Sequence, residues 1–152
     1  MSRKPTARSG SPIYWSAESW AFISLRLFLS LRFILAGLGK FQGEEGYSFS
    51  NYYHGVIPWM TSTFAEKTNL PSFLVTPYAY TIGYVEILLG ILLLLGIKTK
   101  YVLALFALVF VSLAYGQMLL GDNDSVTSIA IHLMVTTAAL YFVRHNKLEA
   151  LR

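Results

Sequence analysis

Cysteine is absent from the 152-residue chain, and charged residues make up only 13% of it. Without cysteine the chain cannot form a disulfide framework, a thiolate zinc site, a cysteine-ligated iron–sulfur cluster or a dithiol redox centre. Soluble domains carry about 25% charged and about 45–50% apolar residues, whereas 55% of this chain is apolar and its mean hydropathy is +0.51. This composition excludes a disordered chain and indicates a membrane protein.

Motifs for several other chemistries are also absent. The sequence has no phosphate-binding glycine loop followed by Lys-Ser or Lys-Thr, no dinucleotide fingerprint, no Gly-x-Ser-x-Gly elbow and no His-Glu-x-x-His pair. Of the three histidines, only His132 falls deep in an apolar segment, so a transmembrane haem held by two histidines of this chain is disfavoured. No metal site is expected. The basic residues flank apolar segments, and nucleic acid is therefore not expected as a partner.

Four apolar stretches are long enough to cross a bilayer, which takes about 20 residues. They cover residues 20–41, 78–97, 101–120 and 126–143. The last three are joined by residues 98–100 and 121–125, connections short enough to make neighbouring helices antiparallel. The sequence therefore predicts an all-α transmembrane four-helix bundle, a single domain over residues 19–143. A basic tail at 1–18 precedes it, and a second tail at 144–152 follows.

The basic residues predict how the helices are oriented. An excess of Lys and Arg in short loops marks the cytoplasmic side of a membrane. If both termini are cytoplasmic, only Lys40 and Lys67 lie outside. Eight basic residues then lie inside: Arg3, Lys4, Arg8, Lys98, Lys100, Arg144, Lys147 and Arg152. We therefore expect cytoplasmic termini and an extracytoplasmic loop at 42–77.

This outer loop, between the first two predicted helices, is rich in aromatic residues. They are Tyr47, Phe49, Tyr52, Tyr53, Trp59, Phe64 and Phe73. Such a density is typical of the headgroup region of a bilayer. A helix over Met60–Lys67, with Pro58 near its start and Pro71 after its end, would lie in that interface. Alternatively, the loop packs as an aromatic cap over the bundle, and the two interpretations are compatible.

Three ionisable residues fall inside predicted spans, where a charge is costly unless it meets a partner or a wet cavity. Arg32, Glu86 and His132 each lie eleven residues from the cytoplasmic end of their span, and Ser112 shares that depth. At 1.5 Å per residue this depth is about 16 Å. Small residues share the faces of these polar groups and permit close helix approach. We therefore expect an Arg32–Glu86 ion pair inside the bundle, with His132 adjacent.

The polar group supports two interpretations. The Arg32–Glu86 pair is either a clamp that fixes helix register or part of a substrate, quinone or proton site. His132 is either a neutral interior histidine or a ligand-binding group. Arg26, about 7 Å inside the membrane, is expected to snorkel to the cytoplasmic surface, and Lys40 to snorkel outward or to line an anion site. The candidate catalytic residues are Glu86 and His132, and the candidate ligand-binding residues are Arg32, Lys40, Glu86, His132 and Ser112.

Two segments carry more specific motifs. The first segment, RLFLSLRFILAGLGKF, is an apolar run that contains arginine and ends in Gly-x-x-Lys-Phe. The second segment is LPSFLVTPYAYTIGYVEILLGILLLLGIKTK. It contains a Leu-Pro turn, then a helix with Val-Glu-x-x-x-Gly, and then a basic loop with threonine. Over residues 23–143 the chain resembles the DoxX family. The resemblance implies a four-span bundle in a bacterial cytoplasmic (inner) membrane. It also implies links to thiosulfate:quinone oxidoreduction or redox homeostasis, and carries over Arg32, Lys40, Glu86 and Gly90.

Two functions are expected on these grounds. The first is a redox-associated subunit that binds a quinone or small anion near the bilayer midplane, at most the membrane subunit of a quinone-linked oxidoreductase. The second is a structural or assembly subunit of a larger membrane complex. A small transporter is a third, weaker expectation, because no predicted span is broken by proline. Quinone is the expected cofactor, with none covalently bound. The expected partners are the lipid bilayer, other membrane or redox subunits, or a second copy of the chain.

Overall fold

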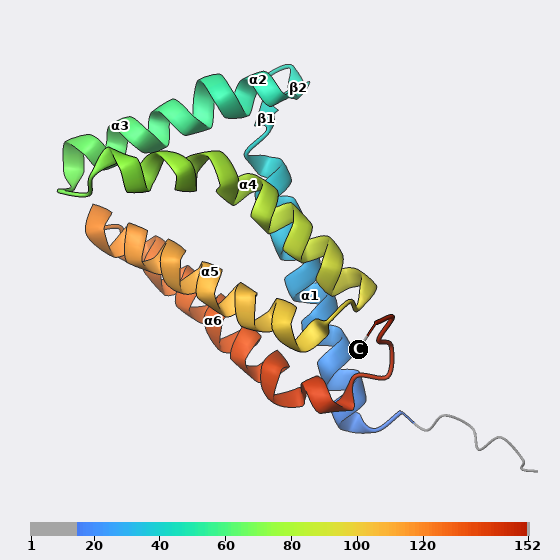
Figure 1. Ribbon diagram of the computed structural model, residues 1–152. Helices are drawn as coiled ribbons and strands as arrows, with labels where there is room; N and C mark the ends of the chain where they lie inside the picture. The colour runs from blue at the N-terminus through green and yellow to red at the C-terminus, as the bar shows by residue number, and fades with distance from the viewer. Residues whose placement is uncertain (1–14, 152) are drawn as a thin grey trace, which may run out of the picture.

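The computed structural model describes residues 15–151, which form helices and one short hairpin (Figure 1). The elements are α1 (Ala17–Gly39), β1 (Gln42–Gly43), β2 (Gly46–Tyr47), α2 (Phe49–Asn51), a π-helical turn (Tyr52–Val56), α3 (Ile57–Lys67), α4 (Ser72–Leu95), α5 (Thr99–Leu120), α6 (Asn123–Phe142) and a 3-10 turn (Val143–His145). Helices α1, α4, α5 and α6 are long and apolar enough to cross a membrane. The predicted all-α four-span bundle is confirmed.

The ends of the long helices follow from local capping chemistry. The Ser16 side chain accepts a hydrogen bond at the start of α1, and the Asp122 side chain accepts one from Ser125 N–H at the start of α6. Gly96 and Gly121 end α4 and α5 with φ of 75°, the left-handed conformation that favours glycine. These stops keep the α4–α5 and α5–α6 connections short, so the three helices run antiparallel.

Helix α4 begins at Ser72, six residues before the predicted span start at Tyr78. It therefore contains Pro77, which the sequence reading placed in the outer loop. Pro77 is the sixth residue of α4 and lies past the four N–H groups that lack partners at a helix start, so the helix loses the backbone hydrogen bond that another residue would donate there. Helix α4 thus carries a proline that the predicted span over residues 78–97 did not include.

The helices pack as two pairs, α1 against α4 and α5 against α6, and α1 also contacts α6 (Figure 1). Two glycines let α1 and α4 approach closely. A Cβ at Gly37 would lie 2.8 Å from the Gly83 carbonyl oxygen, and one at Gly90 would lie 3.0 Å from the Ser30 carbonyl oxygen. Any larger residue would push the two helices apart.

The two ends of the bundle differ. Helix α3 lies alongside the first half of α4, opposite the end where the described chain starts and finishes (Figure 1). We name these the loop end and the termini end. The helix predicted over Met60–Lys67 is present, begins earlier at Ile57, and packs on α4 as a cap.

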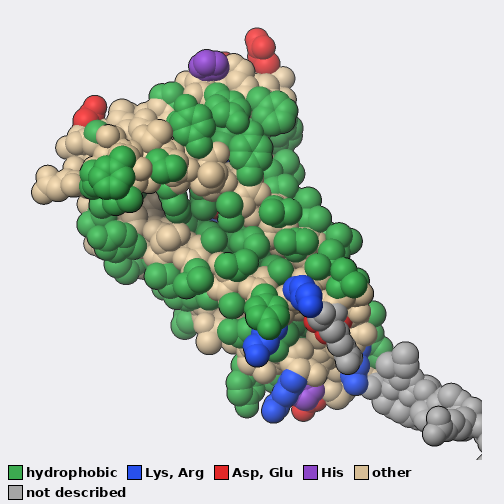
Figure 2. Space-filling model, viewed as in Figure 1, with side chains coloured by type: hydrophobic (Ala, Val, Ile, Leu, Met, Phe, Trp, Pro, Cys, Tyr) green, Lys and Arg blue, Asp and Glu red, His purple; other side chains and the backbone are tan. Residues whose placement is uncertain are grey.

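Charge is also divided between the two ends. Figure 2 shows Lys and Arg side chains gathered at the termini end, with some acidic side chains among them, and other acidic side chains at the tip of the loop end. The exposed basic residues around the termini end are Lys98, Lys100, Arg144 and Lys147. Of the other residues counted as cytoplasmic, Arg3, Lys4, Arg8 and Arg152 lie outside the described range.

Candidate functional site

Glu86 forms an ion pair with Lys40. Lys40 Nζ lies 2.5 Å from Glu86 Oε2, and the Glu86 side chain is 3% exposed. Glu86 thus pairs with Lys40 and not with Arg32, so the predicted Arg32–Glu86 pair and the expectation that Lys40 snorkels outward are both wrong. Lys40 follows α1 on the face that carries buried Phe33 and Gly37, seven and three residues earlier. Its stem therefore points back into the bundle.

Arg32 instead bonds His132. Arg32 Nε donates to His132 Nε2 over 3.3 Å, and His132 Nδ1 lies 2.7 Å from the Ser128 carbonyl oxygen. This pattern fixes a neutral imidazole that donates from Nδ1 and accepts at Nε2. Arg32 lies at the edge of the buried face of α1, towards α6, and is exposed. Its remaining N–H groups make no hydrogen bond within the described residues.

Aromatic rings fix the orientation of the imidazole. The His132 ring centroid lies 5.9 Å from that of Phe28 on α1 and 5.7 Å from that of Phe110 on α5. Phe110 in turn packs edge-on against Phe33, which stacks on Phe106 at 3.7 Å. The polar pair of Arg32 and His132 is thus held against the central apolar core, at the junction of three spans.

Ser112 belongs to a separate polar contact. Its Oγ lies 3.1 Å from the Tyr78 hydroxyl and donates to the Val109 carbonyl oxygen over 2.8 Å. At about 100° per residue, two positions along a helix place Ser112 on the side opposite Phe110. The depth shared with His132 therefore does not bring the two side chains together. Tyr78 was missed because the predicted span started at that residue.

Tyr52 is inserted into the backbone of α4. Its side chain is fully buried, and its hydroxyl donates to the Ala79 carbonyl oxygen over 2.5 Å and accepts from Gly83 N–H over 3.1 Å. In a regular α-helix these two backbone groups would bond each other. A side chain inserted in this way bends a helix, and α4 bends at this level (Figure 1). Burial also raises the pKa of the Tyr52 hydroxyl.

Arg26 binds the last backbone carbonyl groups of α4, at the termini end of the bundle. The side chain is buried, which corrects the prediction that it snorkels. Nε donates to the Leu93 carbonyl oxygen over 2.7 Å and Nη2 to that of Leu94 over 2.8 Å, while Nη1 reaches the Leu148 carbonyl oxygen and Asn146 Oδ1. The last carbonyls of a helix lack intrahelical partners and carry partial negative charge. Arg26 therefore ties α1, α4 and the C-terminal segment together.

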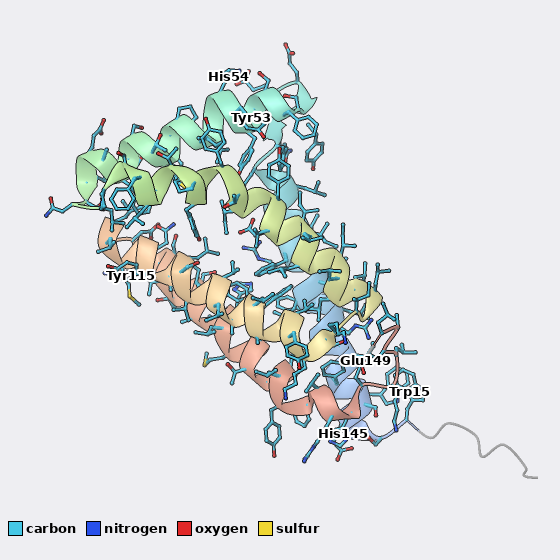
Figure 3. The ribbon with its side chains drawn as sticks, in the orientation of Figure 1. Trp15, Tyr53, His54, Tyr115, His145 and Glu149 are labelled. Carbon is cyan, nitrogen blue, oxygen red and sulfur yellow. The ribbon has the colours of Figure 1, made fainter. Side chains whose placement is uncertain are left out.

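The other two histidines lie far from this region. Figure 3 labels His54 beside Tyr53 at the loop end, and His145 near Glu149 and Trp15 at the termini end. His132 is therefore the one histidine near Arg32. Residues 15–151 contain no group of three or more His, Asp or Glu residues arranged to hold a metal ion.

The family model named DoxX matches residues 21–119. The chain belongs to the DoxX family. The match includes Arg32, Lys40, Glu86 and Ser112 and ends before His132. Over 87 residues the chain is 34% identical to a Bacillus subtilis (strain 168) protein described as "Putative oxidoreductase CatD". That stretch covers 57% of this chain and 52% of the relative, about half its length. No solved structure matches the chain.

Proposed function

We propose that this DoxX-family chain is the membrane subunit of a redox enzyme and binds a quinone at Arg32 and His132. The observation that carries the proposal is the hydrogen bonding of Arg32. One guanidinium N–H group is bonded to His132 and the others make no hydrogen bond within residues 15–151, although Arg32 lies within a span. A guanidinium in an apolar environment needs acceptors, and a quinone carbonyl oxygen is one.

The surroundings of Arg32 favour a lipid-soluble ligand. Its exposed neighbours on α1 are Phe28, Leu31 and Leu35, which are 49%, 53% and 64% exposed. In a membrane these side chains face hydrocarbon, so a ligand that approaches along this face must dissolve in lipid. A quinone does so, whereas a small anion would first have to lose its hydration at high cost. The quinone is therefore the better of the two expected ligands.

Each polar side chain has a distinct role in this proposal. Arg32 donates to the quinone carbonyl oxygen, and His132 holds the guanidinium in position. Lys40 and Glu86 neutralise each other, which leaves the positive charge of Arg32 for the ligand. On reduction a bound quinone would take up two electrons, supplied by a partner redox subunit, and two protons, supplied by water at the membrane surface. The oxidoreductase description of the Bacillus relative supports this class of reaction.

The division of charge supports the orientation in this proposal. The basic termini end faces the cytoplasm, and the loop end faces outward, in a bacterial inner membrane. The exposed Lys98, Lys100, Arg144 and Lys147 support this orientation, because positive charge is retained on the cytoplasmic side.

The test measures quinone binding by the purified protein in lipid nanodiscs. A photoreactive short-chain quinone should label the wild type and the control Arg144→Gln, whose residue is exposed outside the spans. Arg32→Gln should reduce labelling by about tenfold or more, since a hydrogen bond from a charged donor is worth about 1.5–3 kcal/mol. Equal labelling of all three proteins would rule out Arg32 as the quinone contact.

A structural subunit is the second candidate, and the exposure of α6 favours it. Only 11% of its most apolar window is buried within the chain, and exposed Thr127, Ser128 and Thr137 lie on it. Polar side chains on a lipid-facing helix suit a neighbouring helix better than hydrocarbon. If assembly is the sole function, Thr137→Leu should lower the mass of the complex in mild detergent, while Arg32→Gln leaves quinone content unchanged.

A further inference from the structure

We propose that a cavity between α3, α4 and α5 is a second ligand site, which binds a small phenol. The cavity has a volume of about 220 Å³. Figure 2 shows the surface hollowed between the band of α3 with α4 and the band of α5. Its lining includes Met60 and Phe64 from α3, Leu74 and Tyr78 from α4, and Ser112 and Gly116 from α5.

The backbone builds this cavity. Tyr52 bends α4 between Ala79 and Gly83, so the first half of α4 leaves the line of the bundle and runs beside α3 (Figure 1). On α5, Gly116 has no side chain to fill the space, and a Cβ there would lie 3.2 Å from the Phe64 ring. The cavity therefore follows from a helix bend and a glycine rather than from the position of a flexible side chain.

The hydroxyl pair in the lining determines the class of ligand. Ser112 donates its proton to the Val109 carbonyl oxygen, so Tyr78 donates its own proton to Ser112 Oγ. Both protons are used, and the two oxygens keep lone pairs that can still accept. The remaining lining is apolar or aromatic. A matching ligand is thus an apolar ring that carries a hydrogen-bond donor, and a phenol is the simplest such molecule.

The size and position of the cavity fit this ligand. An apolar cavity of about 150 Å³ admits benzene, so about 220 Å³ admits one ring with a hydroxyl and a short alkyl group. Leu74 and Tyr115 also line the cavity and are 52% and 56% exposed, which places them at its mouth. Tyr115 is labelled on α5 in Figure 3. His132 on α6 contacts the side of α5 that carries Phe110, whereas Ser112 lies on the opposite side of α5. The cavity is therefore distinct from the proposed quinone site.

The test compares 4-ethylphenol with 4-ethylanisole, which has a similar shape but no donor, by equilibrium dialysis against protein in nanodiscs. The wild type should bind the phenol about threefold to tenfold more tightly, the range expected for one neutral hydrogen bond. The double substitution Tyr78→Phe with Ser112→Ala removes both hydroxyls and should bind the two compounds equally. Equal affinities in the wild type would overturn the proposal.

In the second part of the test, a larger side chain fills the cavity. Gly116→Leu should lower binding of both compounds to the level of empty nanodiscs. Gly39→Leu adds the same side chain on α1, where a Cβ meets nothing within 4 Å, and should bind like the wild type. Equal binding by these two variants would show that the compounds only partition into lipid. Arg32→Gln should leave phenol binding unchanged, so failure of the quinone proposal is separable from failure of this one.

Discussion

Lys40 at the end of α1 and the buried Glu86 in the middle of α4 form an ion pair, with 2.5 Å between Nζ and Oε2. Removing one partner of such a pair strands the other charge and costs about 3–5 kcal/mol, whereas replacing both with apolar residues costs far less. We expect Lys40→Met and Glu86→Leu each to lower thermostability in detergent more than the double substitution does. Additive losses, measured by thermal unfolding, would contradict a direct interaction.

Arg26 should matter more for stability than Arg32. Arg26 is buried and bonds three backbone carbonyl oxygens and the Asn146 side chain, whereas Arg32 makes one hydrogen bond. Arg26→Met leaves the Leu94 and Leu148 carbonyl oxygens without the guanidinium donor, whereas the Leu93 carbonyl oxygen keeps the Gly96 N–H, and each buried unsatisfied group costs about 1–3 kcal/mol. The unfolding temperature in detergent should therefore fall further for Arg26→Met than for Arg32→Gln. The reverse order would mean that the C-terminal segment does not depend on Arg26.

The sequence was sufficient for the number of spans but not for the pairing of charges. Apolar length and short connections predict four antiparallel helices because both are local properties. The partner of Glu86 depends instead on the relative height of α1 and α4, which the Gly37 and Gly90 contacts set. Because the predicted helix ends were uncertain, the depth of each residue could not show whether Arg32 or Lys40 pairs with Glu86. The spacing of Lys40 from Phe33 and Gly37 was the available signal, since it places the lysine on the buried face.

The insertion of Tyr52 into α4 was even harder to predict from the sequence. It lies in an aromatic loop that resembles a headgroup belt, and its role depends on contact with a helix about thirty residues later. Nothing local marks a tyrosine that will enter another helix. Similarly, Arg26 looked shallow enough to snorkel because its acceptors, the last carbonyls of α4, are not adjacent in sequence.

Tyr52→Phe should make the free energy of unfolding less sensitive to alkaline pH. The pKa of Tyr52 is raised by burial, so its neutral form is favoured in the folded state. Its contribution to stability is therefore complete below the ordinary tyrosine pKa of about 10 and is lost as the pH rises through the higher folded-state value. Chemical unfolding at a series of pH values from about 8 to 11 should show a shallower loss for Tyr52→Phe. Tyr47→Phe is the matched control and should behave like the wild type, because Tyr47 is 65% exposed and its hydroxyl makes no hydrogen bond within the described residues.

Membrane orientation can be tested directly because the chain has no cysteine. Single cysteines at Ser62 on α3 and at Lys100 at the start of α5 both replace exposed residues. If the loop end faces outward, an impermeant thiol reagent should label Ser62→Cys in intact cells. It should label Lys100→Cys only after the cells are permeabilised. The opposite pattern would reverse the proposed topology.

A substitution at His132 tests whether the chain is a redox subunit or a structural subunit. Its imidazole accepts from Arg32 and lies between the rings of Phe28 and Phe110. In the proposed function this acceptor holds the guanidinium in position for the quinone. His132→Phe keeps an aromatic ring between Phe28 and Phe110 but removes the acceptor. We expect this variant to assemble normally and to have a lower quinone-linked turnover per assembled complex. Unchanged turnover with normal assembly would remove the positioning role of His132 and would favour the structural subunit.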